Sequence, residues 1–348
     1  MSSADFTQAN LDQLITHHVG NKQRDENVTL STAATKINDD SIDYLLAYFL
    51  QTIKVEEFYS FSHTVQLDMN EVYTTVADLF ANPKKFIEHS QSIAKLLYEQ
   101  STHPKIKEGE LNIAYLSNIV LDNETVNAIG IFKSETDVPF IKMKSSEKHF
   151  TITHDLGFEL KGIDKGCLIF NTDKDNGYKL LIVDTANKAA EAQYWKDDFL
   201  KVKPINNEFH QTNQFMGIAK NFVTKQIAQE FDVSKADRID LLNRSVAYFK
   251  SHDNFDKAEF EEEVFKDQSL IKSFRDFDNN YRENNAIELD DSFEISPQAV
   301  KKQAKVFKSV LKLDKNFHVY IHGDRSLIQQ GVENDGRKYY KIYFEQEL

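Results

Sequence analysis

The sequence predicts an α+β protein, with N-terminal helices plus an antiparallel β meander, then a mostly helical C-terminal half that ends in antiparallel β strands. Three observations lead to this class. Apolar residues recur at helical spacing early in the chain and again after residue 206. Alternating apolar segments fill the middle and the end. The connections between the middle segments are too short for parallel crossovers, which favours antiparallel pairing.

The first three predicted helices lie between residues 41 and 98. Ser41–Ile53 carries apolar side chains at positions i, i+3, i+4 and i+7, which is typical of an amphipathic helix. Asn70 is a suitable N-cap for a second helix. Asn82 followed by Pro83 predicts the start of a third helix that continues to about Tyr98.

The middle of the chain is predicted to be rich in β structure. Asp175-Asn176-Gly177 lies between two apolar runs and is a strong hairpin signal. A second turn is expected at residues 122–124. The predicted strands are Leu111–Tyr115, Val126–Phe132, a segment around Phe150 and Ile152, Cys167–Phe170, and Tyr178–Val183.

A polar segment with one proline, Lys201–Thr212, marks the expected domain boundary. We therefore expect an N-terminal α+β domain over residues 1–205, with a central antiparallel sheet, and a C-terminal helical domain with terminal β strands over residues 206–348. Helix starts are predicted where a capping residue precedes a helical pattern, at Ser234 with Asp237, at Asp256 with Glu259, and at Ser296-Pro297. The last of these helices is predicted to reach Leu313, and the strands Phe317–Ile321, Leu327–Val332 and Tyr339–Phe344 follow it.

The charge balance does not favour an extended nucleic-acid or membrane surface. The chain has 42 Lys and Arg against 55 Asp and Glu, a net charge of −13. From Phe209 onward the net charge is only −3, so the first 208 residues carry −10. Exposed charges are largely screened beyond about 8 Å at physiological salt, so a local basic stripe can still contact phosphates.

One such stripe is predicted on the helix that begins at Ser296. At 100° per residue, four lysines fall within about 60° of arc, and a fifth lies just beside them. Ammonium groups along one helix face can displace the counterions of DNA. The alternative is a solvated face of a core-packed helix, in which lysine serves solubility. The lysines are Lys301, Lys305, Lys308, Lys312 and Lys315.

Catalytic, cofactor and metal motifs are missing from the sequence. Asn171, Asp173 and Asp175 resemble a calcium loop, but Ile182 stands where the loop needs glutamate. The single cysteine, Cys167, lies in an apolar strand and is expected to be a buried thiol. We therefore expect no catalytic residues, no cofactor and no metal, although an enzyme without a local motif stays a third, weaker hypothesis.

The expected location is the cytoplasm. No apolar run approaches the roughly 18 residues of a transmembrane helix, so no membrane association is expected. The first ten residues show no signal-peptide pattern. A lone cysteine cannot form an internal disulfide, which agrees with a reducing compartment.

Several short segments, in this order, resemble the bacterial nucleoid-associated protein family known as NdpA or YejK. Each segment is a weak motif, and their shared order over nearly the whole chain gives the resemblance its weight. They are Ile15–Lys22, Leu30-Ser31, Tyr48–Leu50, Asn70–Tyr73, Phe86 with Ser90, Gly109–Leu111, Ile131–Lys133, Gln193–Leu200, Asp291–Ile295, Lys301–Leu313 and Arg337–Ile342.

The resemblance implies a protein that associates with the bacterial nucleoid and with DNA, and a type II topoisomerase as a possible partner. It implies no catalytic residue set. We expect sequence-nonspecific binding of duplex DNA, mainly through backbone phosphates. The alternative is an acidic interaction protein that reaches the nucleoid through a protein partner such as the topoisomerase. The oligomeric state stays open.

Overall fold

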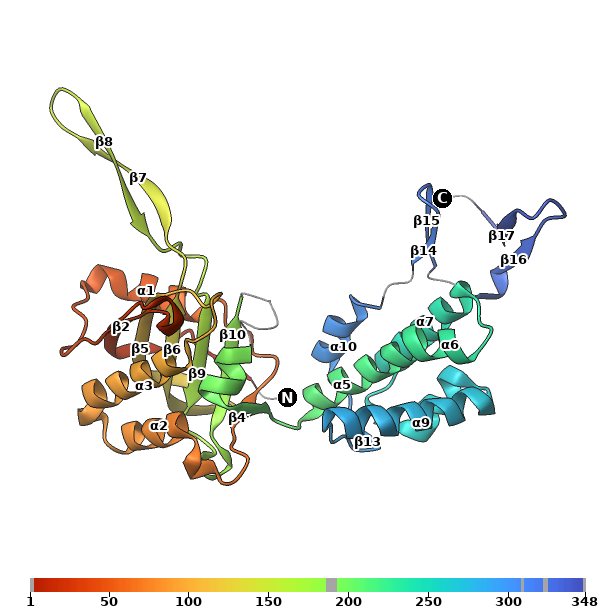
Figure 1. The fold of residues 1–348 in the computed structure, drawn as a ribbon, viewed down its shortest axis with the longest axis horizontal. Helices are drawn as coiled ribbons and strands as arrows, with labels where there is room; N and C mark the ends of the chain where they lie inside the picture. The colour runs from red at the N-terminus through yellow and green to blue at the C-terminus, as the bar shows by residue number, and fades with distance from the viewer. Residues whose placement is uncertain (1–2, 186–192, 308–309, 322–324, 347–348) are drawn as a thin grey trace. The chain divides into compact units, whose positions relative to one another are not determined.

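A computed structural model describes residues 3–185, 193–307, 310–321 and 325–346 of the chain. The chain divides into two compact units, residues 2–205 and residues 206–348. Both units contain helices and antiparallel β strands, so the predicted α+β class is confirmed. Figure 1 labels the elements of both units.

The N-terminal unit is built around a nine-stranded sheet whose strands pair in antiparallel fashion. Its centre follows the predicted strands, and long-range pairs extend it on both sides. In spatial order the strands are β11 (Val202–Pro204), β4 (Tyr59–Phe61), β10 (Lys179–Asp184), β9 (Lys165–Phe170), β6 (Glu124–Ser134), β5 (Gly109–Leu121), β2 (Asn10–Val19) and β3 (Val28–Thr29), and β1 (Ala4–Asp5) pairs with β5.

The predicted hairpin at residues 175–177 is confirmed, and it joins β9 to β10 with Cys167 opposite Ile182. Gly177 ends the turn with a φ angle of +94°, and a Cβ there would lie 2.3 Å from the carbonyl oxygen of Phe61. The turn therefore needs glycine both for its left-handed backbone and for the close approach of β4.

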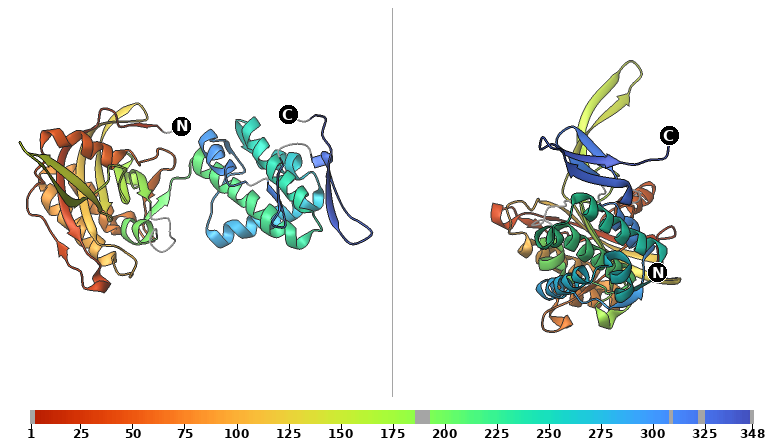
Figure 2. Two further views of the ribbon diagram at one scale, coloured as in Figure 1. Left: turned by 90° about the horizontal axis from the view of Figure 1, so that it is seen from above. Right: turned by 90° about the vertical axis from the view of Figure 1, so that its right-hand side faces the viewer.

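Helices cover both faces of this sheet (Figures 1 and 2). On one face Ile131 and Cys167 pack with the helices α2 (Glu71–Ala81) and α3 (Phe86–Gln100) and with the π-helix η6 (Tyr194–Leu200). On the other face Phe132 and Leu168 pack with α1 (Ile42–Leu50). A sheet that is buried on both faces explains the continuous apolar run of β9.

The capping signals of this unit are confirmed in part. Asn70 caps α2, since its side chain accepts hydrogen bonds from the backbone N–H groups of Val72 and Tyr73. Asn82 does not cap through its side chain, and the 3₁₀ turn η4 (Pro83–Lys85) leads into α3 instead. The remaining short 3₁₀ turns of the unit are η1 (Lys22–Arg24), η2 (Asp39–Ser41), η3 (Leu67–Met69) and η5 (Lys174–Asn176).

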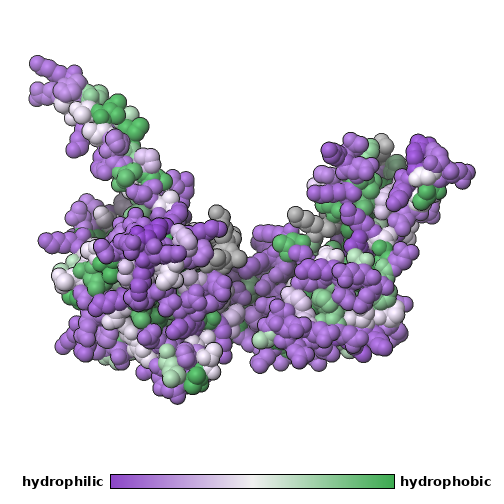
Figure 3. Space-filling view, viewed as in Figure 1, coloured by the Kyte–Doolittle hydropathy of each residue, from purple (hydrophilic) through white to green (hydrophobic). Residues whose placement is uncertain are grey.

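A two-stranded arm stands apart from the sheet. Between β6 and β9 the chain forms β7 (Val138–Ser145) and β8 (Phe150–Gly157), which pair with each other and form a separate sheet. Figures 1 and 2 show this arm extending away from the rest of the N-terminal unit. Hydrophobic and hydrophilic side chains alternate on its surface (Figure 3).

The C-terminal unit is a helical bundle around an aromatic core. Phe215 and Phe255 lie at its centre, with ring centroids 4.2 Å apart, and seven further buried phenylalanines belong to the same core. The capping box of Ser234 and Asp237 is confirmed, and the Asp256 side chain caps the next helix. The elements are α5 (Glu208–Asn221), π-helix η7 (Phe222–Gln226), α6 (Ile227–Glu230), α7 (Lys235–Ser251), β12 (Asn254–Asp256), α8 (Lys257–Phe260), π-helix η8 (Glu261–Phe265), α9 (Gln268–Asn285), β13 (Ser292–Glu294) and α10 (Pro297–Ala304).

The helix predicted over Ser296–Leu313 is too long. It begins where expected, with Ser296 as N-cap, but α10 ends at Ala304. Residues Val310–Leu313 form β14 instead and pair with β15 (Phe317–Tyr320). Leu311 fits both a helical spacing and an alternating one, and its pairing opposite Val319 and its burial against α7 favour the strand.

Two hairpins stand on α7 at the end of the chain. Beside β14–β15, the strands β16 (Ile328–Val332) and β17 (Lys338–Ile342) pair in antiparallel fashion after the 3₁₀ turn η9 (Arg325–Leu327). These strands agree with the predicted ones within one or two residues. Leu311, Ile321 and Ile328 form one small core with Ala236 and Ile239 of α7, which fixes both hairpins on the same helix.

Candidate nucleic-acid interface

The predicted lysines do not lie on one helix face. Lys301 is on α10, and Lys305 is the residue that directly follows it. Lys312 is on β14 and Lys315 is in the turn between β14 and β15, whereas Lys308 lies outside the described residues. The expected arrangement of these lysines along one helix face is therefore wrong, because α10 ends at Ala304, before Lys305, Lys312 and Lys315.

The four described lysines share a different property. Lys301, Lys305, Lys312 and Lys315 are all exposed to solvent. Within the described ranges, none of them has a carboxylate oxygen within 4.0 Å, unlike Lys257, whose ammonium lies 2.6 Å from Asp278. These four ammonium groups are therefore hydrated and available to an anion.

Strand alternation sets the direction of Lys312. Its neighbour Leu311 is buried in the small core on α7, so Lys312 points to the opposite face of the hairpin. Its cross-strand partner is His318, and the next pair on the same face is Val310 with Tyr320. The outer face of β14–β15 thus carries a cation, an imidazole and an exposed aromatic ring.

The second hairpin repeats this chemistry. Tyr339 and Lys341 lie on the face opposite to the buried Ile328, and Tyr339 packs over Gly331. The Lys341 ammonium lies 4.9 Å from the ring centroid of Tyr343. A hydrogen bond with the Tyr343 hydroxyl raises the pKa of Lys341. Together the two hairpins and α10 form what we call the C-terminal basic surface.

The charge of this region is opposite to that of the rest of the chain. Residues 297–348 contain ten Lys and Arg against six Asp and Glu, a net charge of +4, so the other residues carry −17. Sequence reasoning missed His318, Tyr320, Tyr339 and Lys341. Their alternation with apolar residues was the available signal, but only the packing of both hairpins on α7 brings them to one region.

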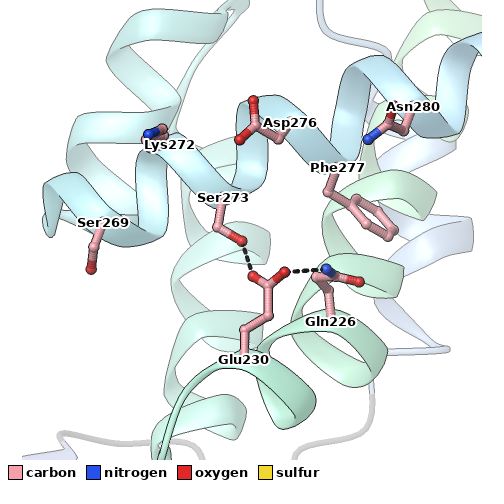
Figure 4. A pocket seen from close by; sticks show the side chains of 8 residues that line it. All are labelled: Gln226, Glu230, Ser269, Lys272, Ser273, Asp276, Phe277 and Asn280. Carbon is pink, nitrogen blue, oxygen red and sulfur yellow. Dashed lines mark hydrogen bonds between the residues drawn. The ribbon is translucent and has the colours of Figure 1, made fainter.

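A polar pocket of about 370 Å³ lies elsewhere in the C-terminal unit, between η7–α6 and α9 (Figure 4). The Glu230 carboxylate in it accepts hydrogen bonds from the Gln226 amide and the Ser273 hydroxyl. Both carboxylate oxygens are thereby occupied by neighbours. The other side chains drawn in Figure 4 do not place a nucleophile against a base, so this pocket supports no reaction class.

One group of described residues brings three metal-ligating atoms within 4.8 Å of one another: His252, Glu259 and Glu263. The His252 Nδ1 atom lies 3.0 Å from the backbone oxygen of Tyr248, and its Nε2 lies 3.7 Å from a Glu263 oxygen. Both glutamates are exposed. The His252 ring already lies within 4.0 Å of an oxygen of each glutamate, so the geometry by itself assigns no ion.

Two lysines buried in the N-terminal unit are each paired with a carboxylate. The Lys165 ammonium lies 2.9 Å from Asp184, and that of Lys133 lies 3.0 Å from Glu135. Burial lowers the pKa of Lys133, and the nearby carboxylate opposes this shift. The Lys133 ammonium also donates to the backbone oxygen of Lys107, so it is held as a structural cation. Burial likewise raises the pKa of the Cys167 thiol, as expected for an unreactive cysteine.

In the described part of the chain, no helix combines the length and the apolarity that crossing a membrane requires. A comparison with curated proteins finds no match to this chain. The family model described as "Nucleoid-associated protein YejK" (NA37) matches residues 15–339, which is nearly the whole chain and includes α10, the hairpin β14–β15 and the strand β16. The chain therefore belongs to this family of nucleoid-associated proteins.

Proposed function

We propose that this nucleoid-associated protein is non-catalytic and binds duplex DNA through contacts of its C-terminal basic surface with backbone phosphates. The observation that supports this most is the free state of four lysines, Lys301, Lys305, Lys312 and Lys315, which are exposed and have no carboxylate within 4.0 Å among the described residues. An unpaired ammonium can release DNA counterions without first breaking an ion pair.

The acidic total charge does not oppose this proposal. The charge of +4 over residues 297–348 is local, and the −17 of the other residues acts only weakly beyond about 8 Å at physiological salt. Phosphate contacts carry no base information, so binding is expected to be nearly independent of DNA sequence. Aromatic and imidazole side chains beside the lysines can add contacts to the sugar–phosphate backbone.

The test is a binding titration of the full chain with labelled 20-base-pair duplexes of two unrelated sequences. Changing Lys301, Lys305, Lys312 and Lys315 to Gln removes four contacts. At about 0.9 released counterions per contact, this weakens binding by on the order of 10³-fold at 0.1 M salt. Both duplex sequences should be affected equally.

A matched control separates the site from the overall charge. Lys54, Lys84, Lys95 and Lys105 are exposed lysines of the N-terminal unit, and changing them to Gln alters the net charge by the same amount. We expect this control to change affinity less than about threefold. Equal effects of the two variants would remove the C-terminal basic surface from the proposal.

A second candidate is an acidic interaction protein that reaches the nucleoid through a basic partner such as a type II topoisomerase. A cleft of about 370 Å³ in the N-terminal unit favours it, because His18 and four carboxylates line it. Such a cleft suits lysine and arginine side chains of a partner. The carboxylates are Glu108, Glu110, Glu135 and Asp137.

Co-precipitation of the full chain with the purified topoisomerase, after complete nuclease digestion, tests this candidate. Capture that survives digestion and weakens when Glu108 and Glu110 are both changed to Gln would support it. Capture that digestion abolishes would mean that DNA bridges the two proteins, and would reject it.

A further inference from the structure

The arm formed by β7 and β8 lacks the support that a β ribbon needs. Its strands pair with each other and with no other described strand. Figures 1 and 2 show no helix lying against it. A two-stranded hairpin alone is marginally stable at best in water, and it becomes stable with more strands or with packing on one face. The arm is therefore incomplete as it stands.

One face of the arm is apolar. Strand alternation and the cross-strand register place Ile141 opposite His154, Met143 opposite Ile152, and Ser145 opposite Phe150 on the same face, with Leu156 next to them. The five apolar side chains among these residues are each 59–71 % exposed. No lysine, arginine, aspartate or glutamate lies on this side, which we call the apolar face of the arm.

The opposite face is suited to water. The Lys142 ammonium lies 2.6 Å from an Asp155 oxygen and 5.2 Å from the ring centroid of Phe140. Phe140 in turn packs over Gly157 at the base of the arm. Lys144, Thr151 and Thr153 complete this polar face. The arm is thus amphipathic, and only its apolar face would gain stability from packing against another surface.

We propose that the apolar face of the arm packs against the same face of a second copy of this chain and joins the two in a homodimer. Size supports this occupant. Five such side chains expose a patch on the order of 500 Å², at the upper end for a soluble monomer. Two patches face to face bury about 1,000 Å², where specific interfaces begin.

The absence of charge on this face also favours a second copy of the chain as its partner. A polyanion such as DNA requires cations, and the apolar face carries none. In a two-fold contact each face meets itself, so an uncharged face brings no like charges together. Two ribbons stacked about 10 Å apart form a four-stranded sandwich, which supplies the packing that each arm lacks.

Cysteine cross-linking of the full chain tests the geometry. The native Cys167 is fully buried, so a cysteine introduced on the arm would be the reactive thiol. Met143→Cys and Ile152→Cys lie in the middle of the apolar face, and Thr153→Cys is the control on the polar face. Mild oxidation should give a covalent dimer, at twice the 40.3 kDa of the chain, with at least one of the first two and not with the control.

Light scattering across a dilution series tests the energetics. We expect the wild type to dimerise, Ile152→Glu to weaken the dimer at least 100-fold, and Thr153→Glu to change it less than about threefold. Both positions are exposed, so the variants should keep their far-ultraviolet circular dichroism.

A wild-type chain that stays at 40.3 kDa up to 100 µM would overturn the proposal. So would a dimer that Ile152→Glu leaves intact. If the wild type is monomeric and Ile152→Glu weakens DNA binding, the apolar face of the arm contacts DNA. If the wild type is monomeric and Ile152→Glu only lowers the thermal stability, another part of the same chain packs on this face. These measurements omit DNA in their first step, so their outcome is independent of the proposed DNA contacts.

Discussion

His17 makes the N-terminal unit sensitive to mild acid. Its ring is 2 % exposed. The Nδ1 atom accepts a hydrogen bond from the backbone N–H of Ser31 at 3.1 Å, so the proton of the neutral ring is on Nε2, which lies 3.1 Å from the Ser90 hydroxyl oxygen. A second proton on Nδ1 would face the Ser31 N–H group. Burial lowers the pKa of His17 from 6.5 to about 4.

The size of the effect follows from these two values. In the unfolded chain the ring binds a proton as the pH falls through 6.5, whereas in the folded unit it does so only near pH 4. The stability contribution is therefore complete above pH 6.5 and is lost as the pH falls toward 4. Linkage over this window amounts to a loss of about 2 kcal/mol between pH 7 and pH 5.

Urea unfolding followed by tryptophan fluorescence measures this loss. Trp195 is the single tryptophan and is buried in the core of the N-terminal unit, so it reports on the unit that contains His17. His17→Asn keeps an acceptor for the Ser31 N–H group but does not titrate. In this variant the free energy of unfolding should differ between pH 7 and pH 5 by about 2 kcal/mol less than in the wild type. His103→Asn, which alters an exposed histidine, should show the same difference as the wild type.

Carboxyl groups whose pKa is lowered do not confound this window. The pKa values of Asp155 and Asp267 are lowered from 3.8, mainly by side-chain hydrogen bonds with Lys142 and Ser269 respectively, so both groups titrate below the window. Their contributions are present above their unfolded pKa of 3.8 and are lost below it. If His17→Asn loses as much stability between pH 7 and pH 5 as the wild type, the reasoning about the buried ring is wrong.

Three further predictions concern stability. Phe215→Ala, at the centre of the C-terminal aromatic core, should lower the free energy of unfolding of that unit by about 3–5 kcal/mol, measured by calorimetry. Gly177→Ala should destabilise the N-terminal unit by more than about 1 kcal/mol in urea unfolding, because of its φ angle of +94° and the nearby β4 carbonyl, and an unchanged midpoint would contradict the assigned turn. Lys165→Met should cost about 3 kcal/mol or more by removing the ammonium that lies 2.9 Å from the buried Asp184 carboxylate, and adding Asp184→Leu should recover part of the loss in the same assay.

Local signals in the sequence predicted much of the fold. Asn70, Ser234 and Ser296 cap helices within three residues of themselves, and the turn at Gly177 joins strands that are close in the chain. Each of these features depends on a few neighbouring residues, so its pattern is complete in the sequence.

Long-range packing decided the features that the sequence did not predict. The strand β2 pairs with β5 about a hundred residues away, and its mixed composition carries no clear alternation. Phe150 and Ile152 were expected in a strand, but their alternation does not reveal that the strand stands outside the main sheet. The end of α10 depends on strands that pair across a turn and on burial of Leu311 against α7.

The candidate site was predicted by residue type and not by geometry. Lysine spacing drew attention to Lys301 and Lys312, which are both exposed, although they lie on a helix and a strand. His318 and Lys341 joined the surface only because two hairpins pack on one helix. Amino-acid composition thus indicated the chemistry, and tertiary contacts set its arrangement.

The salt dependence of DNA binding tests the central claim most directly. If the five lysines predicted from the sequence, Lys308 included, contact phosphates, the logarithm of the association constant falls with the logarithm of salt concentration with a slope of about −4 to −5. Changing Lys301, Lys305, Lys312 and Lys315 to Gln should reduce the magnitude of that slope by about 3.6. A slope that changes by less than about 1 would show that these lysines do not contact DNA, and would contradict the account.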